Sequence, residues 1–187
     1  AGQIKLGLCG TYQIINSCLA ISCIEALMDM GYVISYADIR EGLKAVQWFG
    51  RLSLIGKEPP FFVDGAHNEP AARQLRYSIL QYFTPEVLNG RKLVYIMGVF
   101  SDKDYEKIIE LMLPMADHIF TIATPDNVRA MAAEELKEFI NKKNNIATAC
   151  LNIDDAVKQA VTYNNGDVVV LAFGSLSHLN RIREAYD

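Results

Sequence analysis

The chain has 187 residues, of which 51% are hydrophobic and 21% charged, and its formal net charge is −4 at pH 7. This length suits one ordinary domain with an appended element, and a folded chain of this size buries roughly 70% of its unfolded surface. The acidic balance argues against general binding of nucleic acid or anionic membranes, which needs a basic surface. The sequence shows neither a run of about 18 apolar residues nor a signal-peptide pattern, so we expect a cytoplasmic protein.

Four cysteines occur, at positions 9, 18, 23 and 150. They form no Cys-x-x-Cys pair and no His stands at zinc-ligand spacing from them, so we expect reduced structural thiols and no protein-bound metal. The chain begins with Ala1-Gly2 rather than Met and soon enters an apolar stretch. We therefore expect further chain upstream.

The first 46 residues predict two helices. Apolar residues recur at helical spacing between Thr11 and Gly31, which predicts an amphipathic helix with Thr11 as N-cap and Gly31 just past the C-cap. Ser35 and Asp38 have the spacing of a capping box, with Asp in place of the usual Glu or Gln, and predict the start of a second, shorter helix.

From residue 47 onward, short apolar runs alternate with helical patterns. Strands are predicted at 52–55, 61–63, 93–97, 119–123, 147–151 and 168–173, and helices near 70–82, 104–112, 132–142, 154–163 and 175–186. Nearly all-apolar strands such as 168–173 are typical of a parallel sheet covered on both faces.

The pattern therefore predicts a three-layer α/β/α mixed sheet of about six strands that is mostly parallel. The first two strands are joined by a linker too short for a parallel crossover, so we expect them to be antiparallel. We divide the chain into a helical segment, 1–46, and an α/β domain, 47–187.

The stretch 61–71 reads Phe-Phe-Val-Asp-Gly-Ala-His-Asn-Glu-Pro-Ala, so an apolar strand ends at Asp64 and a helix begins near Pro70. Ligands of α/β proteins bind past the carboxyl ends of parallel strands. Asp64 and His67 are therefore candidate site residues, on a turn that Gly65 keeps compact. The simpler interpretation is that Asp64 caps the following helix and that His67 is an ordinary turn residue.

This stretch resembles the Asp-Gly-Ala-His-Asn-Pro signature of the folylpolyglutamate and dihydrofolate synthases, the folate branch of the Mur ligase superfamily, in their C-terminal domain. Glu69 stands where the family usually has Pro, and Pro70 follows one place later. The resemblance implies a Rossmann-like sheet of six strands with one antiparallel. It also implies that Asp64 holds the nucleotide ribose or orients the incoming amine, and that His67 contacts the incoming glutamate.

A second motif, Gly50-Arg51-Leu52, resembles the family's Pro-Gly-Arg-Leu, with Phe49 in place of Pro. A guanidinium suits phosphate oxygens, where it can stabilise charge that develops during phosphoryl transfer. The resemblance implies that Arg51 belongs to the nucleotide site. The plain alternative is a surface arginine paired with a carboxylate. The segment 50–57 is no Walker A motif, because its spacing is one residue too long and no Ser or Thr follows its Lys.

The third motif, Gly174-Ser175-Leu176, follows the most apolar strand and resembles the family's Gly-Ser-Leu-Tyr element. Backbone N–H groups and the Ser175 hydroxyl there would face an anion in the crevice, and the resemblance implies that Ser175 helps to position glutamate. The alternative is that Ser175 is an ordinary N-cap. His178, nearby, departs from the family pattern and is not assigned to the site.

The entry to the first helix resembles the family's Gly-x-His-Gln-x-x-Asn, with Tyr12 replacing His. Gln13 and Asn16 share one helix face. The resemblance places them near the nucleotide, at a cleft between two domains, whereas for this chain alone a polar stripe is the simpler interpretation. Asp102, Lys103 and Arg129, which lie in two further segments that resemble family elements, are left without a role.

The resemblance runs from Gly10 to Arg183 in the family's order. It implies the C-terminal portion of an ATP-dependent folylpolyglutamate synthase, which adds L-glutamate to a folate carboxylate through an acyl phosphate. Dihydrofolate synthase activity, with dihydropteroate as substrate, is left open.

The implied cofactors are ATP and Mg²⁺, with the Mg²⁺ ligands mainly in an N-terminal ATPase domain of the same protein. We expect a monomer, and we expect this portion to be inactive by itself. Two alternatives remain: another amino-acid-adding Mur ligase, and a stand-alone nucleotide or amino-acid binding module.

Overall fold

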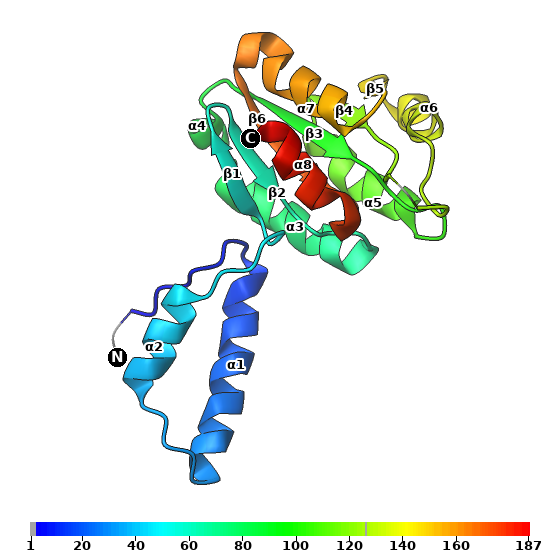
Figure 1. Ribbon diagram of the computed structural model, residues 1–187. Coiled ribbons are helices and arrows are strands. Elements are labelled where there is room, and N and C mark those ends of the chain that lie inside the picture. Colours follow the sequence, from blue (N-terminus) through cyan, green and yellow to red (C-terminus); the bar gives the residue numbers. More distant parts are fainter. Residues whose placement is uncertain (1–2, 126) are drawn as a thin grey trace.

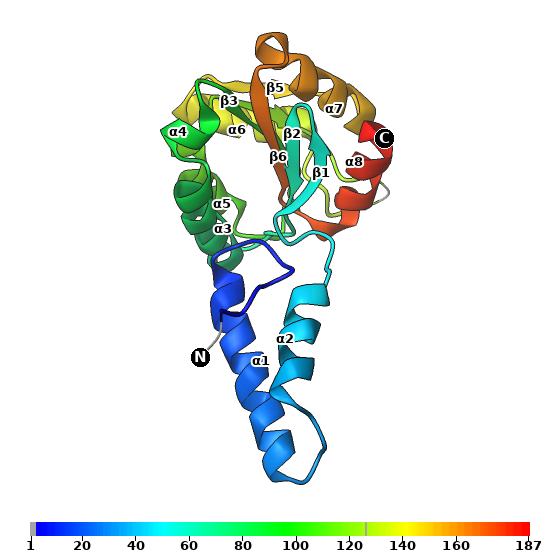
Figure 2. The ribbon, with the colours of Figure 1, turned by 90° about the vertical axis from the view of Figure 1, so that its left-hand side faces the viewer.

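The computed structural model describes residues 3–125 and 127–187. The expectation drawn from Ala1-Gly2 concerns residues outside these ranges. Two helices, α1 (Tyr12–Asp29) and α2 (Tyr36–Ala45), form a hairpin that projects from one end of an α/β unit (Figure 1, Figure 2). Among the described residues, no helix is long and apolar enough to cross a bilayer.

The ends of the hairpin helices follow their sequence signals. The N–H groups of Gly31 and Tyr32 donate to the carbonyls of Met28 (2.9 Å) and Leu27 (3.1 Å), which is the Schellman pattern expected for a glycine past the C-cap. The predicted capping box of α2 is confirmed. Thr11 does precede α1, but its side chain makes no capping hydrogen bond.

The prediction that α1 is amphipathic was wrong. The apolar residues of α1 do not gather on one face of the helix. Ile14, Ile15 and Leu19 are 59%, 70% and 66% exposed, and the buried residue of the helix is Gln13. The physical reason is position: α1 lies outside the layers of the α/β unit (Figure 1), and Ile14, Ile15 and Leu19 are left exposed there.

The α/β unit contains the predicted six-stranded mixed sheet, with strand order β1-β2-β6-β3-β4-β5. The strands are β1 (Ser53–Lys57), β2 (Pro60–Val63), β3 (Lys92–Met97), β4 (His118–Thr121), β5 (Ala147–Ala149) and β6 (Val168–Phe173). β1 and β2 pair antiparallel, as predicted, and the other neighbours pair in parallel.

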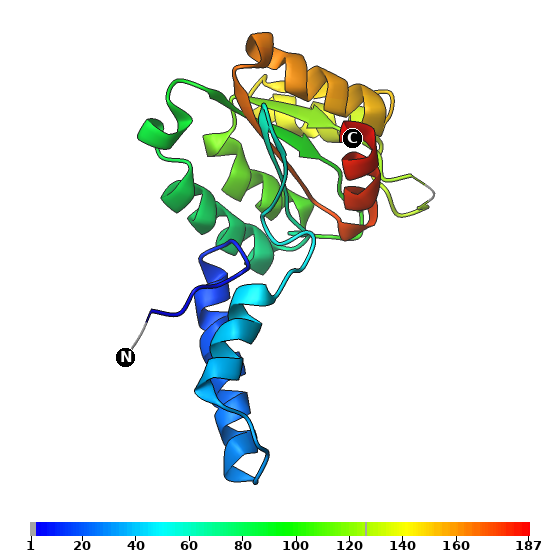
Figure 3. The same cartoon turned by 60° about the vertical axis from the view of Figure 1, so that its left-hand side comes forward.

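Helices cover both faces of the sheet, which confirms the three-layer prediction (Figure 3). One face carries α3 (Glu69–Tyr82), α5 (Tyr105–Met112) and α6 (Ala133–Lys143), and the other carries α7 (Ile153–Thr162) and α8 (Leu179–Tyr186). A short helix that the sequence analysis missed, α4 (Pro85–Leu88), precedes β3, and a 3₁₀ turn (Leu176–His178) precedes α8.

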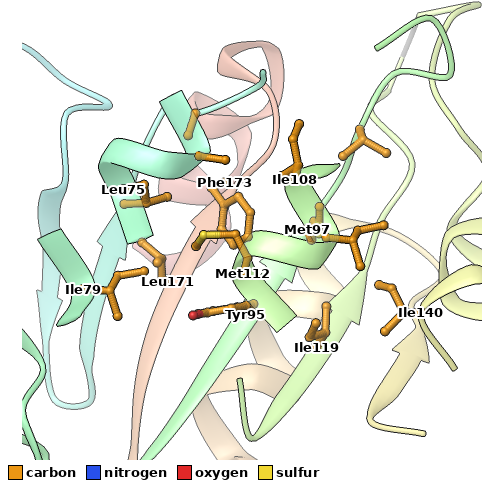
Figure 4. Packing of buried hydrophobic residues seen from close by; sticks show 14 of the residues in the cluster. Leu75, Ile79, Tyr95, Met97, Ile108, Met112, Ile119, Ile140, Leu171 and Phe173 are labelled. Carbon is orange, nitrogen blue, oxygen red and sulfur yellow. The ribbon is translucent and has the colours of Figure 1, made fainter. Parts of the chain in front are cut away.

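The hydrophobic core has two clusters, one on each face of the sheet, and successive side chains of β3 point alternately into one and the other. Tyr95 and Met97 belong to the cluster beneath α3 and α5, whereas Val94 and Ile96 belong to the cluster beneath α7 and α8. Figure 4 shows the first cluster, in which the rings of Tyr95 and Phe173 meet edge to face with centroids 5.2 Å apart.

The carboxyl ends of β2, β3 and β6 meet at one edge of the sheet. Gly174 follows β6 with φ +113°, and a Cβ placed on it would lie 2.2 Å from the carbonyl oxygen of Gly98, which follows β3. The Gly174 N–H donates to the Ala66 carbonyl in the turn after β2 (2.9 Å). This close approach of backbones brings Ser175 beside the turn that carries Asp64 and His67.

Candidate active site

Two adjoining pockets lie at this carboxyl edge. The Arg51 pocket, about 360 Å³, is lined by Tyr12, Asn16, Arg51, Asp64, Gly65, Ala66, His67, Asn68, Ala71 and Gln74. The Ser175 pocket, about 210 Å³, is lined by His67, Phe100, Lys103, Arg129, Ser175, Leu176 and Ser177. His67 borders both pockets, so the turn after β2 forms the wall between them.

Asp64 is only 4% exposed, and three donors already occupy its carboxylate. Oδ2 accepts from the Leu52 N–H (2.8 Å) and the Tyr12 hydroxyl (3.0 Å), and Oδ1 accepts from the Ala66 N–H (2.9 Å). Asp64 does not cap α3, because Asn68 does so by accepting from the Ala71 N–H. The carboxylate instead joins α1, the Arg51 segment and the turn after β2.

The electrostatics of the Tyr12–Asp64 pair follow from burial. Burial raises the pKa of the Asp64 carboxyl, and the hydrogen bonds from Leu52, Tyr12 and Ala66 together with the charge of Arg51 oppose this rise. The pKa of Tyr12 is also raised, by burial and then by the neighbouring Asp64, so its hydroxyl remains a donor at neutral pH.

Arg51 offers a guanidinium that is free for a ligand. The group is half-buried, and among the described residues it donates only to the Gly50 carbonyl, from Nη1 at 3.3 Å. It forms no salt bridge with any residue that the structure describes. Within that part of the chain, the alternative of a surface arginine paired with a carboxylate is therefore wrong.

His67 has a ring nitrogen with a defined role, because its Nδ1 lies 2.8 Å from the Gly65 carbonyl oxygen. A carbonyl can only accept, so Nδ1 carries a proton and donates it, and Nε2 is the ring nitrogen left for a ligand. The half-buried imidazole is thus oriented by the same turn that orients Asp64. In the tautomer that protonates Nδ1 alone, Nε2 could receive a hydrogen bond from an amine.

Ser175 is 2% exposed, and its Oγ accepts from the Ser177 N–H (3.2 Å), so it caps the 3₁₀ turn that begins at Leu176. It nevertheless lines the second pocket together with His67. The cap and the pocket wall are compatible, because a hydroxyl that accepts one bond still has a proton to donate.

Asn16 and Gln13 lie at the base of α1 but differ in access. Asn16 is exposed and lines the Arg51 pocket, whereas Gln13 is buried and accepts from the Asn16 side-chain amide (3.0 Å) without lining the pocket. One pocket is thus lined by Asn16, Arg51, Asp64 and His67. Gln13 does not line it but accepts a hydrogen bond from Asn16, which does.

The sequence analysis left out three residues that the structure places at the site. Tyr12 holds Asp64, and the substitution of Tyr for His in the helix-entry motif was its only signal. Lys103 and Arg129 line the Ser175 pocket. Lys103 forms no salt bridge within the described residues, whereas Arg129 pairs with Asp102 (3.2 Å) and lies over the Phe100 ring (4.8 Å).

The described residues contain no cluster of side chains suited to a divalent cation. Within residues 3–125 and 127–187, no group of three or more His, Cys, Asp or Glu side chains gathers in a way that could hold a metal ion.

The fold and the site together define the class: an α/β domain with a guanidinium, a buried carboxylate and an oriented imidazole at the carboxyl edge of its sheet. Comparison with known proteins agrees. Residues 50–176 match the family described as Mur ligase, glutamate ligase domain, and the chain belongs to this family.

Its relatives include folate enzymes. The chain is 30% identical to the dihydrofolate synthase/folylpolyglutamate synthase of Bacillus subtilis, over 97% of this chain and 41% of that protein. It is 26% identical to the folylpolyglutamate synthase of Lacticaseibacillus casei, over 69% of this chain and 29% of that protein.

A solved structure of Mycobacterium tuberculosis folylpolyglutamate synthase complexed with ADP and AMPPCP is similar, with a TM-score of 0.81 and 25% identity. The match covers 98% of this chain and 42% of that one. The chain therefore spans about two-fifths of the length of this neighbour and of the Bacillus subtilis relative.

Proposed function

We propose that this chain is the C-terminal part of an ATP-dependent ligase that joins L-glutamate to the carboxylate of a folate through an acyl phosphate. The observation that carries the proposal is the wall between the two pockets. Arg51, with its free guanidinium, lies on one side, Ser175 and Lys103 lie on the other, and His67 borders both. The relatives named above are folate enzymes, which supports a folate as the acceptor and glutamate as the added amino acid.

Different residues of this chain would contact the phosphate and the amino acid. Arg51 stabilises the charge on phosphate oxygens as the phosphoryl group is transferred. Lys103, Arg129 and Ser175 suit the carboxylates of the amino acid in the second pocket. Its amine then attacks the acyl carbon, so that a C–N bond forms as the C–O bond to phosphate breaks and inorganic phosphate leaves. His67 accepts a hydrogen bond from the amine through Nε2, and the proton that the nitrogen loses passes to the departing phosphate or to water.

The proposal assigns Mg²⁺ and the phosphate cradle to a preceding ATPase domain of the same protein. Residues 1–46 would belong with that domain, which would cover Ile14, Ile15 and Leu19 on α1. These large apolar side chains are more than half exposed in the hairpin. We propose a monomer in the cytoplasm as the working state.

The test compares the purified 187-residue chain with the full-length protein. The full-length protein should hydrolyse ATP in a reaction that depends on folate and glutamate, and the 187-residue chain should not. Such hydrolysis by the short chain would contradict the proposal, and tight binding of ATP or an amino acid without turnover in either protein would favour a binding module. In the full-length protein, His67→Ala should raise the KM for glutamate and leave that for ATP unchanged. A change confined to ATP would remove His67 from the amine site.

A further inference from the structure

The backbone that carries Arg51 has an uncommon shape. Residues 49–53, called here the Arg51 turn, contain two left-handed residues, Gly50 (φ +79°) and Leu52 (φ +45°), on either side of Arg51. A left-handed backbone is unfavourable for a branched side chain such as that of Leu52. Such a conformation persists only where the surrounding structure fixes it.

The hydroxyl of Ser53 fixes this turn from within. Its Oγ accepts from the N–H groups of Gly50 (3.1 Å) and Arg51 (3.3 Å) and donates to the carbonyl of Trp48 (3.4 Å). A serine hydroxyl has two acceptor positions and one donor position. Both acceptor positions and the donor position of Ser53 are occupied by backbone groups of the Arg51 turn and Trp48, so none remains for a ligand.

Other contacts hold the two ends of the turn. The Leu52 N–H donates to Asp64, and the Gly50 carbonyl accepts from the Gly65 N–H (2.8 Å). At the first residue, the Arg183 guanidinium of α8 lies 4.7 Å from the centre of the Phe49 ring. The backbone of Arg51 is thereby fixed, whereas its guanidinium makes one long hydrogen bond and faces the pocket.

We propose that Ser53 is a positioning residue for Arg51: its hydroxyl shapes the turn so that the guanidinium is held in place before the ligand arrives. The inference rests on the proposed function, because positioning matters only if Arg51 acts on a phosphate. A residue of this kind acts through Arg51 and touches no substrate.

The decisive experiment is a double-mutant cycle on the full-length protein, with turnover of ATP, folate and glutamate as the readout. Ser53→Ala removes two hydrogen bonds to the turn and should lower kcat about 5- to 10-fold, with the KM for glutamate unchanged. Ser53→Thr keeps the hydroxyl and should restore most of the loss. In an Arg51→Ala background, Ser53→Ala should have no further effect. Thr162→Ala, which removes an exposed hydroxyl bonded to backbone carbonyls in α7, is the control and should leave kcat unchanged.

A second measurement needs no turnover. Hydrogen exchange of the 187-residue chain should become faster at the Gly50 and Arg51 amides in Ser53→Ala, while the Leu52 amide, bonded to Asp64, stays protected. If the full-length wild type shows no ligase activity, the proposed function fails and this measurement alone decides whether Ser53 holds the turn. Unchanged exchange, normal turnover in Ser53→Ala, or an equal loss of turnover in the Arg51→Ala background would each overturn the inference.

Discussion

At the level of single residues, Arg51 combines a free guanidinium with a fixed backbone. This combination is costly to replace, because a lysine in its place would keep the charge but lose the planar fork that contacts two phosphate oxygens at once. In the proposed ligase, the difference should appear in turnover and hardly at all in stability.

We therefore expect Arg51→Lys to lower kcat in the full-length protein about 100- to 1,000-fold, the effect of losing one strong donor to a transition-state anion. The melting temperature should change little, since Arg51 has no ion-pair partner in the described structure. Arg91→Lys, which alters an arginine bonded to backbone carbonyls near α4, is the matched control and should keep its turnover. A large fall in melting temperature with near-normal kcat would show that Arg51 is structural.

A second residue-scale prediction concerns His178, which is fully buried and bonded through Nδ1 to the Thr124 hydroxyl (3.1 Å). Its Nε2 has no hydrogen-bond partner in the described structure. Burial lowers its pKa from the ordinary 6.5 to about 4, and the nearby Phe173 carbonyl only partly opposes the shift. As the pH falls from 6.5 to 4, His178 binds a proton in the unfolded chain but not in the folded chain. The free energy of unfolding therefore falls over this range.

Between pH 7 and pH 4.5 this uptake should cost the 187-residue chain about 2.5 kcal/mol, at about 1.4 kcal/mol per pH unit. His178→Asn keeps a polar partner for Thr124 but does not titrate, so its stability should fall less over the same range by about that amount. Urea unfolding of both proteins at the two pH values measures the difference. Parallel pH profiles would show that His178 is protonated in the folded state.

The sequence predicts candidate site residues but not their contacts. Asp64 and His67 were predictable because an apolar strand ends in polar residues, and strand ends point at the crevice. That three donors bind the Asp64 carboxylate was not predictable, because two of them, on Tyr12 and Leu52, lie 52 and 12 positions away in the chain. The proposed role of Ser53 was not predictable for a similar reason. A serine at the start of a strand indicates no particular role in the sequence, because its hydrogen bonds to the preceding turn are seen only in the structure.

At the level of elements, every predicted strand is present. A strand of this sheet can be recognised from a short apolar run in the sequence alone, without knowing which strands pair with it. The failures have separate causes. The four-residue α4 is too short to show helical periodicity. The apolar residues of α1 predict a helix, but the sequence does not show whether they gather on one face or are covered by another element.

The glycine pair at the ends of β3 and β6 gives the element-scale prediction. Gly174→Ala should destabilise the 187-residue chain by about 3 kcal/mol or more, because the new Cβ meets the Gly98 carbonyl and the backbone is left-handed. Gly90→Ala is the control, because that residue has φ +84° with nothing within 4 Å of the added Cβ, and it should cost only about 1 kcal/mol. Equal losses in chemical denaturation would mean that the two strand ends are not in contact.

At the level of the whole molecule, the hairpin surface should matter only when a partner domain is present. Ile15→Glu should leave the stability of the 187-residue chain within about 0.5 kcal/mol, because the side chain is 70% exposed. In the full-length protein, the same change should lower the melting temperature, because a buried charge without a partner is costly. Leu75→Glu, in the core, should unfold both proteins. A melting temperature unchanged by Ile15→Glu in the full-length protein would show that this face of α1 is not covered.

The base of the hairpin is fastened to the α/β unit by few polar side-chain contacts: Thr11 bonds to Ser78 (3.0 Å) and Tyr12 bonds to Asp64 (3.0 Å). Breaking contacts of this kind costs on the order of 1–3 kcal/mol. A ligand that favours one orientation of the hairpin by about 100-fold in affinity supplies as much free energy. Asn16 lies on one side of this joint and Arg51 on the other, and both line the same pocket. A molecule that contacts both residues would favour the hairpin orientation in which they line one pocket. Ligand binding and the orientation of the hairpin would then be thermodynamically coupled.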